Sequence, residues 1–256
     1  MNSVKRIAGL AGLVLVLGAP ARADNTICTG AIYLVPDGST HVGTFTAPNQ
    51  DRWFRFVAKA NRSYALVSEN LSPTDVQAGV GMFPPIGPDC MGTMLFTTVS
   101  NMTEPVTIDP LNSYGSVRRT MMVAANTEVF FRIDGSADFR VRVEETTQFS
   151  PAWTTNGTFD TFYSLQNTTN AVISGTLTLS SVAGAVIDTE AVVIPVGGTF
   201  SANTSAMGTT RGQSGVATLV HNGPPGAVVC EVAVANFTIT PPYIQAVKCQ
   251  TARQQR

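Results

Sequence analysis

Few side chains in this sequence could carry out hydrolysis. The chain contains only two histidines, His41 and His221, and a serine nucleophile needs a histidine placed to take its proton. Ser214 lies in Gly-Gln-Ser-Gly-Val, which is similar to the Gly-x-Ser-x-Gly turn of hydrolases. The second glycine comes one position early, however, and no helical pattern follows. We therefore expect Ser214 to lie in a turn or begin a strand, His41 to end a turn, and His221 to face solvent at a strand end.

Two carboxylates are spaced as a catalytic pair could be. Cleavage of a glycosidic bond needs two carboxyl groups flanking one bond. Asp188 and Glu190 are two residues apart in a segment rich in β-branched residues, so both would point to the same face of a strand. The same spacing is found on any exposed strand. The sequence therefore leaves open a carbohydrate-active hydrolase or lyase whose acidic pair is assembled across strands.

Metal and cofactor sites have little support in the sequence. The segment from Asp134 to Asp138 is similar to an acidic calcium loop, but it lacks the further oxygen donors and the distal glutamate, so a hairpin turn is favoured. The chain has no glycine-rich phosphate loop before a helix. We predict no catalytic residue, no metal and no cofactor.

Tryptophans are the remaining candidates for ligand binding. In the alternating pattern of its strand, Trp53 points to the face opposite to Phe54 and Phe56. Trp153 lies in Ser-Pro-Ala-Trp, a linker-like segment. A flat ring on a sheet surface can stack on a sugar or on a partner protein. Alternatively, Trp53 covers a second core face and Trp153 wedges between two domains. Trp53 and Trp153 are the predicted ligand-binding residues.

The four cysteines indicate an oxidising compartment. No Cys-x-x-Cys pair or neighbouring histidine supplies zinc-ligand spacing, so two disulfides are expected. Four cysteines allow three connectivities. We favour Cys28 with Cys90 and Cys230 with Cys249, because each pair then stays within one domain. The second pair is also symmetric about a turn at Ile239-Thr-Pro-Pro242, as opposed residues of a hairpin would be.

The elements that position these residues are strands. Phe139 to Glu144 alternates apolar and charged residues without a miss, and Arg52 to Ala58 behaves similarly, so one face of each should be buried and the arginines should face water. Turn signals separate the apolar segments, as at Gly197-Gly198. After the first 23 residues no long segment has a helical period. We expect an all-β protein of two β-sandwich domains.

Composition and the N-terminus set the cellular context. Of 256 residues, 44% are apolar and 13% charged, about half the usual charged share of roughly 25%. This excludes a disordered chain and a nucleic-acid platform. Residues 1–23 have the basic start, short apolar stretch and Ala-Arg-Ala ending of a secretory signal peptide. We predict a secreted or periplasmic protein with no membrane span after signal removal.

Charge divides the remainder of the chain. Residues 24–149 hold 13 acidic and 9 basic side chains, whereas residues 150–256 hold four of each. We therefore predict a first domain over 24–149 and a second over 150–256. The segment from Ser72 to Ser116 is poor in strand signal, and its prolines exclude a central strand at Met82–Cys90, so we interpret it as an ordered excursion.

The first domain resembles a known family. Gly43-Thr-Phe45, the run from Asp51 to Ala60, Tyr64-Ala-Leu66 and the strand from Asp138 to Glu144 are similar to the core strands of bacterial pre-peptidase C-terminal domains. That resemblance implies a secreted jelly-roll sandwich with an accessory role, and no catalytic residue carries over. Residues 150–256 look like the immunoglobulin-type modules of bacterial surface proteins. We expect a non-catalytic binding or structural module at the cell surface, recognising a polysaccharide or an extracellular protein and no nucleic acid.

Overall fold

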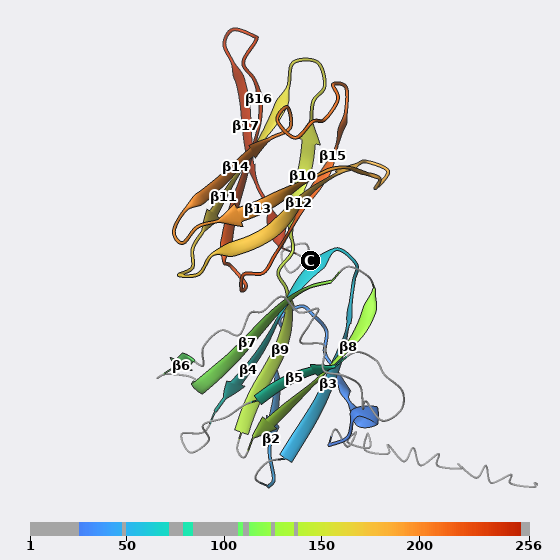
Figure 1. Cartoon of the computed structure of the whole chain (residues 1–256), viewed down its shortest axis with the longest axis vertical. Coiled ribbons are helices and arrows are strands. Elements are labelled where there is room, and N and C mark those ends of the chain that lie inside the picture. Colours follow the sequence, from blue (N-terminus) through green and yellow to red (C-terminus); the bar gives the residue numbers. More distant parts are fainter. Residues whose placement is uncertain are drawn as a thin grey trace, which may run out of the picture.

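The described part of the chain folds into four β-sheets arranged as two sandwiches. The computed structural model describes residues 26–47, 50–71, 79–83, 107–109, 113–123, 126–135 and 138–251. Two sheets form from strands before Gln148 and two from strands that begin at Gln148 or later, and the two pairs are stacked along the long axis of the molecule (Figure 1). The prediction of an all-β fold is confirmed. The signal peptide predicted for residues 1–23 lies outside the described residues.

The first sandwich, nearer the N-terminus, contains sheets A and B. Sheet A has the strand order β1-β3-β8-β5, with bounds β1 (Ile32–Tyr33), β3 (Gln50–Ala58), β8 (Thr127–Gly135) and β5 (Gly79–Phe83). Sheet B has the order β2-β9-β4-β7-β6, with bounds β2 (His41–Thr44), β9 (Asp138–Glu145), β4 (Arg62–Asn70), β7 (Ser113–Val123) and β6 (Thr107–Asp109). A short 3-10 helix, η1 (Cys28–Gly30), precedes β1.

Aromatic side chains fill the space between these two sheets. Alternate residues of β3 and β9 point inward, as expected from the period of two; the buried ones are Phe54, Phe56, Ala58, Phe139, Val141 and Val143. The Phe54 ring stacks on Phe131 at 5.4 Å between centroids and meets Phe139 edge-on at 6.1 Å. Such offset and edge contacts are the favoured arrangements of aromatic pairs.

The arginines of β9 are not simply solvated, as the alternation suggested. Arg140 and Arg142 both form ion pairs with Glu69 on the neighbouring strand β4. Their side chains are 29% and 27% exposed, because cross-strand pairing brings the opposite charges together on the outer face of sheet B.

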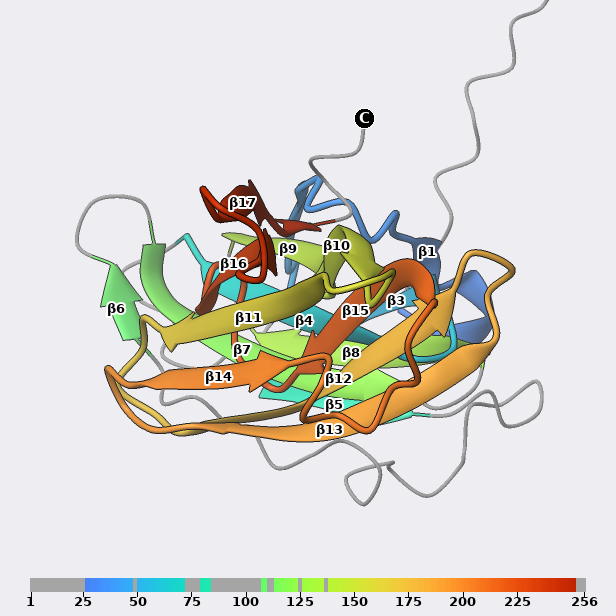
Figure 2. The same ribbon diagram turned by 90° about the horizontal axis from the view of Figure 1, so that it is seen from above.

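The second sandwich contains sheets C and D. Sheet C has the order β13-β12-β15-β10-β18, with bounds β13 (Val186–Ile194), β12 (Ile173–Ser181), β15 (Ser214–His221), β10 (Gln148–Thr154) and β18 (Gln250–Thr251). Sheet D has the order β14-β11-β16-β17, with bounds β14 (Thr199–Asn203), β11 (Asp160–Asn167), β16 (Val228–Asn236) and β17 (Tyr243–Lys248). Figure 2 shows the four strands of sheet D side by side in this order.

Glycines in left-handed conformations separate strands of this second sandwich, at Gly197 where the sequence indicated a turn and also at Gly226. Gly197, between β13 and β14, has φ +64°, and Gly226, before β16, has φ +77°. These left-handed conformations are costly for residues with a Cβ. The hairpin of β16 and β17 turns through the predicted Ile239–Pro242 segment, where the Thr240-Pro241 bond is cis.

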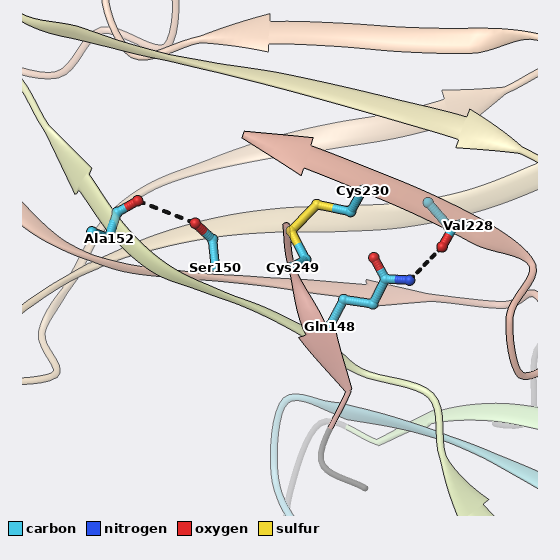
Figure 3. Close-up of a disulfide and its surroundings, with 6 residues drawn as sticks. All are labelled: Gln148, Ser150, Ala152, Val228, Cys230 and Cys249. Carbon is cyan, nitrogen blue, oxygen red and sulfur yellow. Dashed lines mark hydrogen bonds between the residues drawn. A yellow bond between two sulfur atoms is a disulfide. The ribbon is translucent and has the colours of Figure 1, made fainter. Parts of the chain in front are cut away.

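A disulfide joins the two strands of that hairpin near its base. Cys230 of β16 is bonded to Cys249, with 5.4 Å between their Cα atoms, and the Cys249 N–H donates to the Cys230 carbonyl at 3.1 Å. Gln148 points toward the start of the same strand, where its Nε2 donates to the Val228 carbonyl at 2.5 Å (Figure 3). The predicted pairing of Cys230 with Cys249 is therefore confirmed. Cys28 is also disulfide-bonded, whereas its predicted partner Cys90 lies outside the described residues.

The chain passes from one sandwich to the other earlier than position 150. Strand β9 ends at Glu145 and β10 begins at Gln148, so Thr146 and Thr147 connect the two sandwiches and the predicted boundary between residues 149 and 150 lies inside β10. The charge pattern gave a later position because β10 itself carries no charge. The division into a jelly-roll-like and an immunoglobulin-like domain stays a prediction.

The segment interpreted as an excursion contributes strands to both sheets of the first sandwich. Gly79–Phe83 forms β5 at the edge of sheet A, and Thr107–Asp109 forms β6 at the edge of sheet B. An edge position agrees with the prolines that follow Phe83, which cannot donate to a ladder. Most of the remaining excursion lies outside the described residues.

Candidate binding site

The hydrolytic residues do not come together. Ser214 is exposed at the first position of β15, and His221 is at the last position of the same strand, about 23 Å away at roughly 3.3 Å per residue. His221 does not face solvent as predicted: it is 1% exposed, and burial lowers its pKa to about 4. His41 lies in the first sandwich, with its ring 5.4 Å from that of Phe54, and burial lowers its pKa.

Asp188 and Glu190 share a face, but it is the face that turns toward the core. They lie on β13 in the same alternation as Val192 and Ile194, which are buried. Strand β13 is an edge strand, and its pairing with β12 has a bulge next to Asp188. Bulges and inward-pointing charges are devices that stop an edge strand from pairing with another chain. This accounts for the two carboxylates without any catalysis.

Metal ligands do not gather anywhere in the part of the chain that the structure describes. No group of three or more His, Cys, Asp or Glu side chains is close enough there to hold a metal ion. Asp134 is near the end of β8 in sheet A and Asp138 begins β9 in sheet B, so the two strands do not form the hairpin that the sequence favoured. The Asp138 carboxylate accepts a hydrogen bond from the Thr44 hydroxyl at 2.7 Å. Nor does any described helix have the length and apolar character needed to cross a membrane.

Neither tryptophan is exposed for stacking, so the structure lends no support to the predicted binding role of Trp53 and Trp153. Trp53 is 9% exposed and packs with Cys28, Ala31 and Phe130, because η1 and the residue after it cover this side of sheet A. Its role matches the alternative of a second core face.

Trp153 is 1% exposed and lies in the core of the second sandwich rather than between the two sandwiches. A bulge in the pairing of β10 with β15, between Ser150 and Trp153, interrupts the simple alternation. The indole Nε1 donates to the Ser180 carbonyl at 2.9 Å, so its one polar group is satisfied inside the protein.

A hollow on the outer face of sheet D is the feature best suited to hold a ligand. Its volume is about 380 Å³. Cross-strand pairing places the outward-facing residues of this part of sheet D in two rows that run across the strands, and all of them except Lys248 line the hollow. The first row is Asn203, Phe162, Ala233 and Ala246, and the second row is Ser201, Ser164, Glu231 and Lys248. We call the hollow formed along these rows the sheet D groove.

The first row explains why the surface is hollowed. Ala233 and Ala246 are small, so the surface drops beside the Phe162 ring, which stands on the neighbouring strand. Phe237, 61% exposed, contacts Phe162 edge-on at 5.8 Å between centroids. Asn203 at the other end is held in place because its Oδ1 accepts hydrogen bonds from the Ser205 hydroxyl and the Ala206 N–H at 2.7 and 2.8 Å.

The second row places polar side chains beside Phe162, Ala233 and Ala246 of the first row. Ser164, Ser201 and Glu231 are exposed, and within the described residues their side chains form no hydrogen bond or ion pair. Glu231 stands opposite Lys248 in the ladder. Hydroxyl, carboxylate and ammonium groups are therefore presented along one line, about 7 Å from the apolar row because same-face residues are two positions apart.

Sequence reasoning missed this groove, although part of its signal was present. The residue pattern predicts strands at β11 and β16, and alternation indicates which of their residues face outward. What the sequence lacked was the order β14-β11-β16-β17 and the register, which bring Phe162 next to Ala233 and Ala246.

Comparisons with known proteins add little. No protein-family model matches the chain, and no curated protein matches it. Among solved structures, the full extracellular region of zebrafish Gpr126/Adgrg6 is similar at 10% sequence identity and a TM-score of 0.24, over 90% of this chain and 32% of that one. The chain thus spans about a third of that protein's length, and a likeness this low carries no argument.

Proposed function

We propose that this protein is an extracellular, non-catalytic binding module that recognises a polysaccharide through the sheet D groove. The observation that carries the proposal is that a row containing Phe162, Ala233 and Ala246 runs beside a row of exposed polar side chains, of which Ser164, Ser201 and Glu231 have no side-chain partner among the described residues. A sugar ring has the matching chemistry, since it presents C–H groups on its faces and hydroxyls around its edge. Stacking and a few placed polar groups are how such sites obtain orientation and specificity.

An extracellular setting is supported by the cysteines. Cys230 and Cys249 form a disulfide and Cys28 is also bonded, and such bonds persist in oxidising compartments such as the periplasm and the cell exterior. The N-terminal signal peptide predicted from the sequence agrees with this setting. A hydrolase or lyase using Asp188 and Glu190 has less support, because neither residue lines the groove.

The proposal is tested by binding rather than by turnover. The purified protein is applied to a polysaccharide array, and calorimetry follows with an oligosaccharide that gives a signal. Phe162→Ala should weaken binding about tenfold, equivalent to about 1.4 kcal/mol, because the ring on the groove is removed. Val193→Ala, at an exposed position on the opposite sheet, should bind as the wild type does.

A second variant distinguishes the effect on binding of removing the Phe162 ring from the effect of filling the sheet D groove. Ala233→Leu keeps Phe162 but fills the groove, so binding should fall, whereas Ala191→Leu on the outer face of sheet C should have no effect. Wild-type binding that survives both Phe162→Ala and Ala233→Leu would place the ligand elsewhere. Absence of any polysaccharide signal, with capture of an extracellular protein instead, would replace a sugar ligand by a protein one.

A further inference from the structure

The two sheets of the second sandwich end in strands that are protected very differently. Strand β17 is the last strand of sheet D, and within the described residues no strand pairs with its outer edge. The β16–β17 hairpin extends to the end of the molecule farthest from the first sandwich (Figure 1). The backbone N–H and C=O groups along such an edge can accept a strand from another chain.

Exposed apolar side chains gather on the same hairpin. Phe237 and Ile244 are 61% and 60% exposed, and Ile239 and Tyr243 are also exposed. The sequence from Val232 to Val247 contains no charged residue. Exposed apolar groups on one projecting element, without intervening charge, are typical of a surface that contacts another protein.

Strand β13, the corresponding edge strand of sheet C, has features that protect it from pairing with a strand of another chain. It has a bulge in its pairing with β12 and carries Asp188 and Glu190 on its inward side. Either feature discourages another strand from adding there. Strand β17 has neither, since its pairing with β16 is regular over six residue pairs and its one charge, Lys248, is at the end.

We propose that β17 pairs in antiparallel fashion with β17 of a second copy of this chain. An antiparallel pair of identical strands is related by a twofold axis normal to the sheet, so the contact is self-complementary and closes as a dimer. Residues directly opposite must point to the same side of the sheet, which centres the pair on Gln245 or Ala246. Lys248 of one copy then lies opposite Pro242 or Ile244 of the other, and never opposite its own symmetry mate.

The dimer would place two binding grooves close together. The proposal of a dimer itself does not depend on the identity of the ligand. A twofold axis normal to the sheet joins two copies of sheet D into one eight-stranded sheet with both outer faces on the same side. The two grooves would then lie side by side on one surface. Two linked sites bind a repeating polymer more tightly than either site alone.

Measurement of mass in solution tests the pairing. Analytical ultracentrifugation of the purified protein at concentrations up to the submillimolar range should show a dimer. Ile244→Lys, at an exposed position of β17, should convert it to a monomer, because edge lysines oppose strand addition. Val193→Lys, equally exposed on β13, should remain dimeric. A wild-type monomer over the whole range, or a dimer that persists in Ile244→Lys, would overturn the proposal.

Cross-linking tests the register and not only the mass. Opposite residues in antiparallel strands have Cα atoms about 4.5 to 5.5 Å apart, within reach of a disulfide. One of the two variants Gln245→Cys and Ala246→Cys should therefore form a covalent dimer on mild oxidation, whereas Val193→Cys should not. A dimer in which neither variant cross-links would show that the contact is not β17 against β17.

Discussion

The backbone N–H of His221 donates a hydrogen bond to the Oγ of Ser63 at 3.4 Å, across 158 residues of chain. Ser63 belongs to β4 in the first sandwich and His221 to β15 in the second. Ser63 also receives the Thr146 N–H on its carbonyl and donates its own N–H to the Thr147 hydroxyl, both at 2.8 Å. A fully buried serine and the two threonines of the connection thus join the sandwiches by polar contacts.

His221 makes the stability of this junction depend on pH. Its pKa is about 4 in the folded protein and near 6.5 when unfolded, so between these values the unfolded chain binds the extra proton. The free energy of unfolding should therefore be unaffected by His221 above pH 6.5, fall by up to about 3 kcal/mol as the pH drops toward 4, and level off below. Urea denaturation at a series of pH values measures this.

The His221 contribution is isolated by comparison with His221→Gln. Glu145 lies near the same junction, and burial raises its pKa, so its own effect has the opposite sign: acid relieves the cost of burying its charge. Subtracting the pH profile of His221→Gln from that of the wild type removes Glu145 and leaves the imidazole. Parallel profiles between pH 4 and 6.5 would show that His221 titrates normally.

Gly215 should not tolerate a side chain. A Cβ built there would be 1.8 Å from the Ser180 carbonyl oxygen and 2.9 Å from Trp153 Nε1, which are the acceptor and donor of the buried indole hydrogen bond. Gly215→Ala should lower the free energy of unfolding by about 3 kcal/mol or prevent folding. Gly184→Ala is a control at an open turn position with φ +86°, where the loss comes from backbone strain alone and should be about 1 kcal/mol. Equal losses in thermal unfolding would contradict the packing at Gly215.

The side-chain amide of Asn167 should be required for the stability of the second sandwich. Its Nδ2 donates to the carbonyls of Ala171, Ile194 and Pro195 at 2.7, 3.2 and 3.0 Å, and the residue is 1% exposed. Asn167→Asp keeps the shape but points an oxygen at three carbonyl oxygens, so we expect a loss on the order of 3 kcal/mol in denaturant unfolding. Asn156→Asp, at an exposed turn, should change stability little. A loss that disappeared at low pH, where the introduced carboxyl group would be protonated, would support the charge explanation over loss of shape.

The Cys230–Cys249 disulfide should stabilise the second sandwich. The bond closes a loop with a sequence separation of 19, for which restriction of the unfolded chain gives about 3 kcal/mol. The double substitution of Cys230 and Cys249 by serine should lower the free energy of unfolding by about that amount. Cys230 lies in the core cluster of the second sandwich only. The unfolding midpoint followed by Trp153 fluorescence should therefore fall, and the midpoint followed by Trp53 fluorescence should fall less. An unchanged midpoint for both signals would contradict it.

Period-two patterns were predictable from the sequence because they are local. Phe54, Phe56, Phe139 and Val141 are buried as alternation requires, and the Cys230–Cys249 pair follows from hairpin symmetry. The burial of the two tryptophans was not predictable in the same way because it is not local: η1 covers Trp53, and a bulge changes the alternation before Trp153. The same holds for His221, whose neighbours on the other sandwich are distant in sequence.

The sequence by itself determined that this chain would form strands, where the β16–β17 hairpin would turn, and which faces of β3 and β9 would be apolar, since these depend on neighbours a few residues away. Only the tertiary structure decided that Phe162 lies beside Ala233 and Ala246. It also decided that Asp188 and Glu190 point inward from an edge strand, and that β17 is the last strand of sheet D. Strand order and register are set by the packing of whole sheets against each other, and the free energy of that packing is summed over residues that no local pattern connects.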